Sequence, residues 1–336
     1  MQVSVALCTY NGQKYITQQL ESILNQSVLP NEIIICDDNS ADNTCLIINN
    51  LIEKTSVKIT LIKNKIGLGT TKNFEKALKL CNNEIIFLAD QDDIWRKDKI
   101  ELSIKYFLEN PAKKVLFTDA DLVDEKGQKL GVSLWNQVRF DDQTQNEWKN
   151  GNEIDVLIKG NRVTGCTVAV KKEFIERIIP FPENLISENF IHDTWLSWFA
   201  ASEGTIGFLT EPLVDYRQHP QQQIGAIAQK RPRAIRFYER IFRKNQTKRG
   251  VYLKQANYFA EIEKMLKPYF IKNHLALQKI ERAKLHYEQR GNLSRNFFKR
   301  FSQVYDQTKL GNYTHFQNPD SKWFTPYLTI LGDIFE

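Results

Sequence analysis

The sequence predicts an α/β protein with a doubly wound, largely parallel sheet, followed by a mainly helical C-terminal extension. Short apolar runs alternate with stretches of helical periodicity through the first part of the 336-residue chain, as in repeated β-α units. Each of the first four apolar runs ends in polar or turn-forming residues, and open α/β sheets bind ligands at that end of their strands. Beyond about residue 226, apolar residues recur at helical spacing among many lysines and arginines.

The first two β-α units come directly at the start of the sequence. Residues 3–7 predict a short strand that ends in the polar segment 8–12. Apolar residues at helical spacing then predict a helix before the Pro30-Asn31 turn. Residues 32–36 predict a second buried strand, and the residues Asp42-Asn43-Thr44 are suited to capping the helix that follows.

The third and fourth strands are predicted at residues 57–62 and 85–89, separated by a glycine loop and a helix over 70–81. The loop matches neither a dinucleotide-binding glycine motif nor a P-loop. The fourth strand ends in three carboxylates within four positions, which are Asp90, Asp92 and Asp93. Carboxylates at close range repel one another, and hard oxygen ligands suit Mg²⁺ or Mn²⁺. Taken alone, such a short pattern more often marks a solvated acidic turn.

The following segments predict further elements of the same domain. A helix is expected from residue 98 to about 108 and a strand over 115–118, and the polar run 123–128 predicts a hairpin turn. The Asp119-Ala120-Asp121 run is therefore expected to be structural. Residues 130–155 give no clear period.

Two polar segments stand beside the last predicted elements of this domain. Asp193 lies one residue before a predicted helix, where an N-cap is the default role of an aspartate. Gly165 belongs to a turn that leads into a strand at 168–170. Residues 208–213 lead to Tyr216-Arg217-Gln218-His219, in which an arginine and a histidine are suited to phosphate and metal recognition.

The composition favours a cytoplasmic protein. No run approaches the ~18 to 20 uninterrupted apolar residues of a membrane span. The N-terminus enters a strand at once, so we expect no signal peptide. The five cysteines are scattered and never form a C-x-x-C pair, which fits buried thiols in a reducing compartment better than disulfides or a zinc site.

The charge distribution predicts a boundary near residue 225, with a domain at 1–225 and a basic helical region at 226–336. Residues 230–300 hold 20 Lys and Arg against 5 Glu, a balance of +15, while the remainder holds 26 basic and 35 acidic residues, a balance of −9. A basic helical region can pack on the catalytic domain with a solvated basic face, or lie on an anionic membrane. Nucleic acid is the least favoured partner, because no nucleic-acid-binding motif is present.

Four motifs in order resemble those of the family 2 glycosyltransferases. They are Val5-Ala6-Leu7-Cys8-Thr9-Tyr10-Asn11-Gly12, then Gln26-Ser27 with Glu32-Ile33-Ile34-Ile35-Cys36-Asp37-Asp38-Asn39-Ser40, then the Gly67 loop with Lys72-Asn73, then Asp90-Gln91-Asp92-Asp93-Ile94-Trp95. The resemblance covers about the first 220 residues. It implies the GT-A fold, a Rossmann-like mixed sheet flanked by helices, and a sugar-nucleotide donor. The D-Q-D-D-I-W form and Tyr216-Arg217-Gln218-His219 are similar to bacterial rhamnosyltransferase-like enzymes of surface polysaccharide synthesis.

The resemblance implies a nucleotide-sugar site at the carboxyl ends of the strands. Thr9, Tyr10 and Asn11 would surround the base and ribose, and Asp38 would accept a hydrogen bond from the base N3–H. That bond would select uracil or thymine over cytosine, which lacks the donor. The other residues that the resemblance assigns to the donor are Gly67, Lys72, Asp90 near the ribose, Gln91, and Arg217 near the diphosphate.

The metal and acceptor sides follow from the same resemblance. Asp92 would ligate Mn²⁺ or Mg²⁺ through the diphosphate, and His219 is a second candidate for contact with metal or diphosphate. Asp37 and Asp93 are expected to be second carboxylates that cap the helices after them. Asp193 would be the general base, although His192 replaces the glutamate that usually precedes it. Gly165, His192 and Trp195 are placed on the acceptor side, with a turn and a core position as the alternatives for Gly165 and Trp195.

Together these observations give the hypothesis of an inverting, metal-dependent glycosyltransferase. It would move a sugar, rhamnose among the candidates, from a dTDP- or UDP-linked donor to a glycan hydroxyl in surface polysaccharide, O-antigen or capsule synthesis. A lipid-linked acceptor and peripheral contact with the inner face of the membrane through the basic helices accompany this hypothesis. The alternatives are transfer to a glycoprotein, and a non-catalytic carbohydrate- or nucleotide-binding protein that kept the fold. The sequence leaves the sugar, acceptor, linkage and oligomeric state open.

Overall fold

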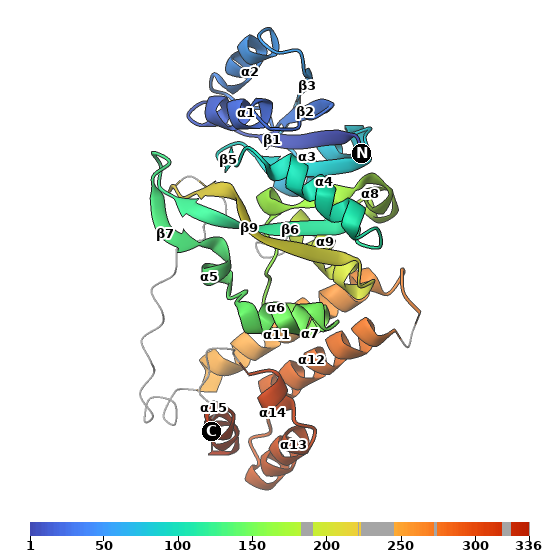
Figure 1. Ribbon diagram of the computed structural model, residues 1–336. Helices are drawn as coiled ribbons and strands as arrows, with labels where there is room; N and C mark the ends of the chain where they lie inside the picture. Colours follow the sequence, from blue (N-terminus) through green and yellow to red (C-terminus); the bar gives the residue numbers. More distant parts are fainter. Residues whose placement is uncertain (183–190, 221, 223–244, 272–273, 318–323, 336) are drawn as a thin grey trace. The chain divides into compact units, whose positions relative to one another are not determined.

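The computed structural model describes residues 1–182, 191–220, 222, 245–271, 274–317 and 324–335 (Figure 1). The chain divides into two compact units, each described by itself below. The first consists of Met1–Asn146 and Arg162–Ile227, and the second of Glu147–Asn161 and Ala228–Glu336. Residues 147–161, which the sequence did not separate from the N-terminal domain, thus group with the C-terminal helices. The first part of the helical pattern expected beyond residue 226, with Ile235, Tyr238, Ile241 and Phe242 at helical spacing, lies outside the described residues.

Nine strands form one mixed sheet among the described residues of the first unit, in the order β3-β2-β1-β4-β8-β6-β9-β5, with β7 paired to β6 (Figure 1). Strands β1 to β4 are parallel, as predicted, whereas β8 runs antiparallel to both β4 and β6. The strands are β1 Val3–Thr9, β2 Glu32–Asp37, β3 Lys58–Lys63, β4 Ile85–Asp90, β5 Ile94–Trp95, β6 Val115–Val123, β7 Lys129–Ser133, β8 Ala169–Lys171 and β9 Ile206–Arg217.

The helices of this unit connect and cover the sheet. Helices α1 and α2 pack on each other, while α3 packs on β1 and β2. The helices are α1 Ile16–Leu24, α2 Thr44–Ile52, α3 Thr70–Leu80, α4 Lys99–Glu109, α5 Leu134–Val138, α6 Asp142–Lys149 (which continues into the second unit), the 3₁₀ turn η1 Gly165–Thr167, α8 Lys172–Ile178 and α9 His192–Ser202.

The strand order places a topological switch point between β1 and β4. The chain winds from β1 to β3 in one direction and then returns past β1 to form β4, so the connections diverge there. All residues of β1 and β2 are buried, which explains why both read as continuous apolar runs. In the register, Cys8 lies opposite Asp90 and Thr9 opposite Asp37. The polar strand ends predicted to share one edge of the sheet therefore do so.

Two predicted elements differ from the structure. Strand β6 extends to Val123 because its second half pairs with β7 and β9, so Asp119 and Asp121 lie within a strand rather than after one. Helix α9 begins at His192, and Asp193 therefore lies in its first turn instead of before it. All eleven positions of α9 are buried. The helix therefore has no exposed polar face, and its sequence lacks the amphipathic pattern from which the bounds of a helix can be predicted.

The second unit is helical. It contains α7 Glu153–Ile158, α11 Asn245–Leu266, α12 Leu275–Gly291, α13 Phe297–Lys309, α14 Asn312–His315 and α15 Thr325–Phe335. Helices α11 and α12 pack along each other, and Lys279 of α12 forms an ion pair of 2.5 Å with Asp155 of α7. Among the described residues, no helix combines the length and apolar character needed to cross a membrane.

Candidate active site

The ends of β1 and β2 are joined by side chains that the sequence assigned to the nucleotide. The Thr9 hydroxyl donates to Asp37 Oδ2 at 2.8 Å, and the Asn11 amide donates to Ser40 Oγ at 2.8 Å. Asn11 has a positive φ of 48°, and its side-chain oxygen accepts the Ala41 N–H. Asp37 is fully buried and ties this loop together. It does not cap α2, which corrects the prediction for this residue.

Gln91 and Tyr10 form a two-bond clamp between the ends of β4 and β1. Gln91 Oε1 accepts the Tyr10 N–H at 2.8 Å, and Gln91 Nε2 donates to the Tyr10 carbonyl at 3.0 Å. A Cβ on Gly12 would lie 2.2 Å from Gln91 Oε1, so the close approach requires glycine at this position. The Tyr10 side chain is 59% exposed. The clamp therefore fixes the backbone of Tyr10 and leaves its ring at the surface.

Asp38 organises the glycine loop. Its carboxylate accepts the N–H groups of Leu68 at 2.7 Å and Gly69 at 2.9 Å, as well as the Asn64 side-chain amide at 2.8 Å. A Cβ on Gly67 would lie 3.7 Å from Asp38 Oδ2. The predicted bond to a base N3–H would thus be a fourth bond to a buried carboxylate. The sequence did not indicate the Leu68 and Gly69 partners, because backbone N–H groups leave no side-chain signal.

Lys72 lies in the first turn of α3, beside the same loop. Its ammonium donates to Glu75 Oε2 at 2.8 Å and to the Phe181 carbonyl at 3.4 Å. Glu75 in turn accepts the Phe181 N–H at 3.0 Å. Lys72 and Glu75 therefore anchor the segment at Phe181 to α3, and Glu75 is a member of this site that the sequence did not indicate.

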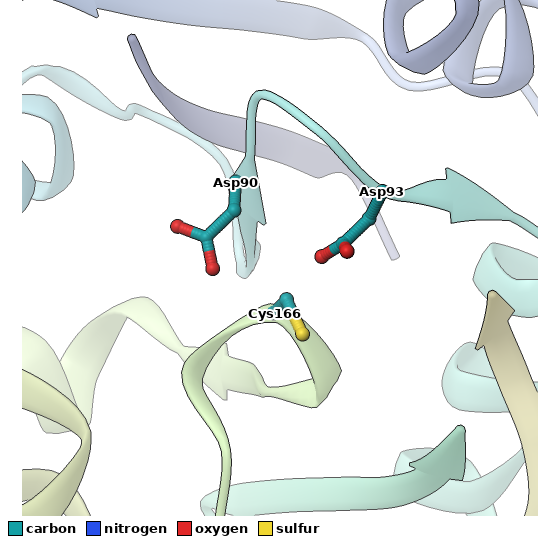
Figure 2. A group of neighbouring side chains, drawn as sticks. All are labelled: Asp90, Asp93 and Cys166. Carbon is teal, nitrogen blue, oxygen red and sulfur yellow. The ribbon is translucent and has the colours of Figure 1, made fainter. Parts of the chain in front are cut away.

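Asp90 and Asp93 form an acidic cluster with Cys166 (Figure 2). Their ligand atoms lie within 4.8 Å of one another. Burial, together with the negative charges of Asp92 and Asp193, raises the pKa of Asp90 to about 7. Burial and its acidic neighbours also raise the pKa of Asp93 well above the usual range. Asp93 faces this cluster and accepts the Arg217 N–H, so it is not the helix cap that was predicted.

Lys99 supplies a buried cation beside this cluster. Its ammonium donates to the Cys166 carbonyl at 2.7 Å and lies 4.2 Å from the centre of the Trp95 ring. Burial lowers the pKa of Lys99 to about 8, while the neighbouring acidic groups oppose that shift. In sequence Lys99 is an ordinary lysine near a helix start, and nothing in its spacing distinguishes it from a surface residue.

Asp92 and His219 meet, as the prediction that both contact metal or diphosphate requires. His219 Nε2 lies 2.8 Å from Asp92 Oδ2, and the His219 ring lies 4.9 Å from that of Tyr15. This contact joins the ends of β4 and β9.

Arg217 has a structural environment. It is 2% exposed, and its guanidinium donates to the carbonyls of Asp92 at 2.7 Å and Glu125 at 2.9 Å and to the Gln18 side chain at 2.6 Å. The guanidinium also lies 4.8 Å from the Tyr15 ring centre. Its donors thus hold the Asp92 backbone and the β6–β7 turn. That Arg217 lies near a diphosphate stays a prediction.

Asp193, His192 and Gly165 form a second buried group. The Gly165 N–H donates to Asp193 Oδ2 at 3.2 Å, and the Thr194 hydroxyl to Asp193 Oδ1 at 3.3 Å. Burial raises the pKa of Asp193 to about 6 and is opposed by hydrogen bonds from Thr194 and Gly165. A Cβ on Gly165 would lie 3.0 Å from His192 Nε2, which explains why glycine occupies this turn.

His192 and Trp195 differ in what they offer to a ligand. His192 stacks on Phe74 with ring centroids 4.2 Å apart, and neither of its ring nitrogens has a hydrogen-bond partner within the described ranges. Burial lowers the pKa of His192 to about 3, so the ring is neutral. Trp195 is fully buried and donates to the Ile178 carbonyl at 3.3 Å. Trp195 is therefore a core residue, and the structure does not support acceptor stacking.

The residues at the end of β4 fit a hard divalent cation. Asp93 Oδ2 lacks an N–H or O–H partner within the described part of the chain, and the weakly donating Cys166 thiol is its neighbour. Burial, and after it the neighbouring carboxylates, raise the pKa values of Asp90 and Asp93, and a bound cation would favour their ionised forms. Burial also raises the pKa of the Cys166 thiol, so this soft ligand stays protonated. Carboxylate oxygens from this cluster and Asp92 are the donors that Mg²⁺ and Mn²⁺ prefer.

Comparison with known proteins identifies the family. The family model described as "Glycosyl transferase family 2" matches residues 4–156. The dTDP-rhamnosyl transferase RfbG of Shigella flexneri is 31% identical over 229 residues, which cover 66% of this chain and 74% of that protein. The UDP-Glc:alpha-D-GlcNAc-diphosphoundecaprenol beta-1,3-glucosyltransferase WfgD of Escherichia coli is 32% identical over 108 residues, covering 32% of this chain and 42% of WfgD.

A solved structure shares the fold. The crystal structure of S. aureus TarS 1-349 in complex with UDP aligns with a TM-score of 0.52 at 18% identity, covering 98% of this chain and 90% of that one. The mixed sheet flanked by helices is thus of the GT-A type, as the sequence predicts. With the family match and the RfbG relationship, the chain belongs to glycosyl transferase family 2 and is a glycosyltransferase.

Proposed function

We propose that the protein transfers a sugar from a nucleoside diphosphate to an acceptor hydroxyl with inversion, and that Asp193 is the general base. The observation that carries this proposal is the environment of Asp193. It is a buried carboxylate with a pKa of about 6, held by the Gly165 N–H and close enough to Asp90 to raise that residue's pKa. A base with a pKa below but near neutral pH is ionised in the cell and can still accept a proton.

In this mechanism Asp193 takes the proton of the acceptor hydroxyl as its oxygen attacks the anomeric carbon. The bond from that carbon to the diphosphate oxygen breaks on the opposite face, and the nucleoside diphosphate leaves with the electron pair. Mn²⁺ or Mg²⁺, held by Asp92 with His219 beside it, would neutralise the charge of the leaving diphosphate. Arg217 acts indirectly, because its bond to the Asp92 carbonyl fixes the position of Asp92.

The donor side of the proposal rests on the ends of β1, β2 and β4. The exposed Tyr10 ring, fixed by the Gln91 clamp, offers a stacking surface to a nucleotide base. Asp38 keeps its proposed role with the base N3–H as a fourth bond, while Thr9, Asn11 and the Gly67 loop shape the pocket through their contacts with Asp37, Ser40 and Asp38. Lys72 and Asp90 are also proposed to lie beside the donor nucleotide.

We propose a dTDP- or UDP-linked donor and a glycan acceptor of surface polysaccharide synthesis. The name of RfbG, a dTDP-rhamnosyl transferase, supports the dTDP-linked donor, and that of WfgD, which acts on a diphosphoundecaprenol-linked sugar, supports a lipid-linked acceptor. With such an acceptor, the protein would make peripheral contact with the cytoplasmic face of the membrane. His192 would meet the acceptor side, because its buried ring nitrogens have no partner in the described chain.

The test is a transfer assay with dTDP-rhamnose and UDP-glucose as donors and a diphosphate-linked GlcNAc acceptor carrying a lipid chain. We expect transfer with one donor, inversion at the anomeric carbon, loss of activity in EDTA and recovery with Mn²⁺ or Mg²⁺. Transfer that is unaffected by EDTA would remove the metal from the proposal. Retention of configuration in the product would remove Asp193 as the base in a single displacement.

A further inference from the structure

Helices α13 and α15 each bury one face in a small core of their own. That core contains Leu293, Val304 and Tyr313, against which Ile330 and Ile334 of α15 pack. A buried ion pair accompanies it, in which Arg290 Nε lies 2.7 Å from Asp333 Oδ2. Both helices are therefore held by one face, and the exposed side chains on their other faces are not needed for this packing.

A second face of α13, about 100° around the helix from the buried side chains Val304 and Gln307, is aromatic and exposed. Phe297, Phe298, Phe301 and Tyr305 are all exposed, Phe298 at 81%, and they fall within an arc of about 100° on a wheel of 3.6 residues per turn. Buried aromatic side chains are normal in a soluble helix bundle, whereas four exposed ones on a single helical face need another explanation.

Helix α15 extends this face. Leu331 and Phe335 lie one turn apart and are both exposed, Phe335 at 68%. The two helices meet where the Phe297 and Phe335 ring centroids lie 6.2 Å apart, and Arg300 Nε donates to the Ile334 carbonyl at 2.8 Å. The six side chains of this continuous surface, called the aromatic-basic surface below, are Phe297, Phe298, Phe301, Tyr305, Leu331 and Phe335.

Cations outnumber acids in the segment that carries these apolar side chains. Between residues 295 and 309 there are four cations, Arg295, Lys299, Arg300 and Lys309, against one acid, Asp306, a balance of +3 (4 − 1). Arg295 and Lys299 are exposed. A helix with an exposed aromatic face and with Lys and Arg on the rest of its surface has the composition of helices that lie in the plane of a membrane interface.

We propose that the aromatic-basic surface binds an anionic lipid bilayer, with the aromatic side chains in the headgroup and acyl boundary and the cations at the lipid phosphates. This deepens the membrane contact included in the proposed function, because it assigns that contact to α13 and α15 among the basic helices. A second copy of the chain fits the surface less well. Two copies that paired through this surface would each bring a segment with a balance of +3, and these like charges repel.

The experiment is flotation of the purified full chain with vesicles, in parallel with light scattering. One vesicle preparation contains equal parts of phosphatidylglycerol and phosphatidylcholine, and the other phosphatidylcholine alone. We expect binding to the anionic vesicles that falls with rising salt. The double variant Phe298→Ser/Phe301→Ser should lower the bound-to-free ratio about tenfold or more, and Arg295→Glu/Lys299→Glu roughly tenfold at low salt.

The matched control is Leu46→Ser/Leu108→Ser, which removes two large exposed apolar side chains from α2 and α4 of the first unit. It should bind vesicles like the wild type. The proposal is overturned if the wild type does not float with anionic vesicles, or if the double phenylalanine variant floats as well as the wild type. It is also overturned if light scattering shows that the wild type is a dimer, that it does not bind vesicles, and that Phe298→Ser/Phe301→Ser is a monomer. That result would show that the surface binds a second copy of the chain.

Nucleotide binding in solution separates this inference from the proposed transferase function. Phe298→Ser/Phe301→Ser should bind UDP or dTDP as the wild type does, because both side chains belong to the aromatic-basic surface and not to the site at β1 and β4. Vesicle binding without nucleotide binding would support membrane binding by the aromatic-basic surface and count against the proposed transferase function. Nucleotide binding without vesicle binding would overturn membrane binding by this surface and leave the transferase function unaffected.

Discussion

Replacing Asp193 with asparagine tests whether this residue is a base or a helix cap. Asparagine keeps the size of the side chain and an oxygen that can accept the Gly165 N–H, which lies 3.2 Å from Asp193 Oδ2. It removes only the capacity to take a proton. We therefore expect Asp193→Asn to lose transfer while it binds the donor nucleotide as the wild type does.

The expected size of both effects follows from the site. General-base catalysis contributes about 10²- to 10⁴-fold, so kcat should fall by that factor. The pKa of Asp193 is about 6 in the folded chain against a reference value of 3.8, a difference of about two units. Since one unit corresponds to about 1.4 kcal/mol, burying the ionised carboxylate costs at most about 3 kcal/mol of folding free energy above pH 6.

This cost has a definite pH dependence. Between pH 3.8 and about 6 the folded chain holds a proton on Asp193 that the unfolded chain releases, so this carboxyl's contribution to stability falls as pH rises through that window. Asp193→Asn should therefore match or exceed the wild-type free energy of unfolding at pH 7.5, and the difference should vanish near pH 4. In the wild type, kcat should rise with pH to a plateau above about 6.

Measurements of kcat, nucleotide affinity and urea denaturation on the same preparations decide the matter. Asp119→Asn is the matched control, because Asp119 is also a carboxylate whose pKa is raised by burial, but its hydrogen bonds are to the Trp135 and Ala120 amides. The control should keep its kcat. If Asp193→Asn retains kcat within tenfold of the wild type, or loses stability and nucleotide binding together, Asp193 is structural and the reasoning is refuted.

Two further substitutions test other parts of the molecule. Gly12→Ala should displace Gln91 and weaken nucleotide binding about tenfold, measured by calorimetry, because the new Cβ would lie 2.2 Å from Gln91 Oε1. Gly250→Ala has nothing within 4 Å of its Cβ and should bind normally. Asp333→Asn leaves the Arg290 guanidinium buried without its counter-charge and should lower the free energy of unfolding of the second unit by about 3–5 kcal/mol in urea denaturation; a loss below 1 kcal/mol would contradict this.

The fold could be predicted because its signals are local. Strands β1, β2 and β4 are buried on both faces and appear in the sequence as continuous apolar runs, and the polar residues after them mark one edge of the sheet. Helix α9 could not be delimited in the same way. Its buried positions include polar residues such as His192, Asp193 and Ser197, so the pattern of an exposed and a buried face is missing.

The sequence predicts which residues lie near one another at the site, but not which groups they contact. The sequence brings Asp92 and His219 to one place through the family resemblance, and the structure confirms that they are in contact. The Arg217 guanidinium donates to the backbone carbonyls of Asp92 and Glu125. Every residue carries such a carbonyl, so no sequence pattern shows in advance that an arginine will bind the backbone instead of a ligand. Lys99 went unnoticed for a related reason, since its partner is the Cys166 carbonyl.

The most direct test of the account is calorimetric titration of the wild type and Asp92→Ala with UDP and dTDP, with and without Mn²⁺. The account predicts that the wild type binds one of these nucleotides more tightly when Mn²⁺ is present, and that Asp92→Ala loses this metal-dependent part of the affinity. A wild type that binds neither nucleotide, or an Asp92→Ala variant with unchanged metal dependence, would contradict a donor site at the end of β4.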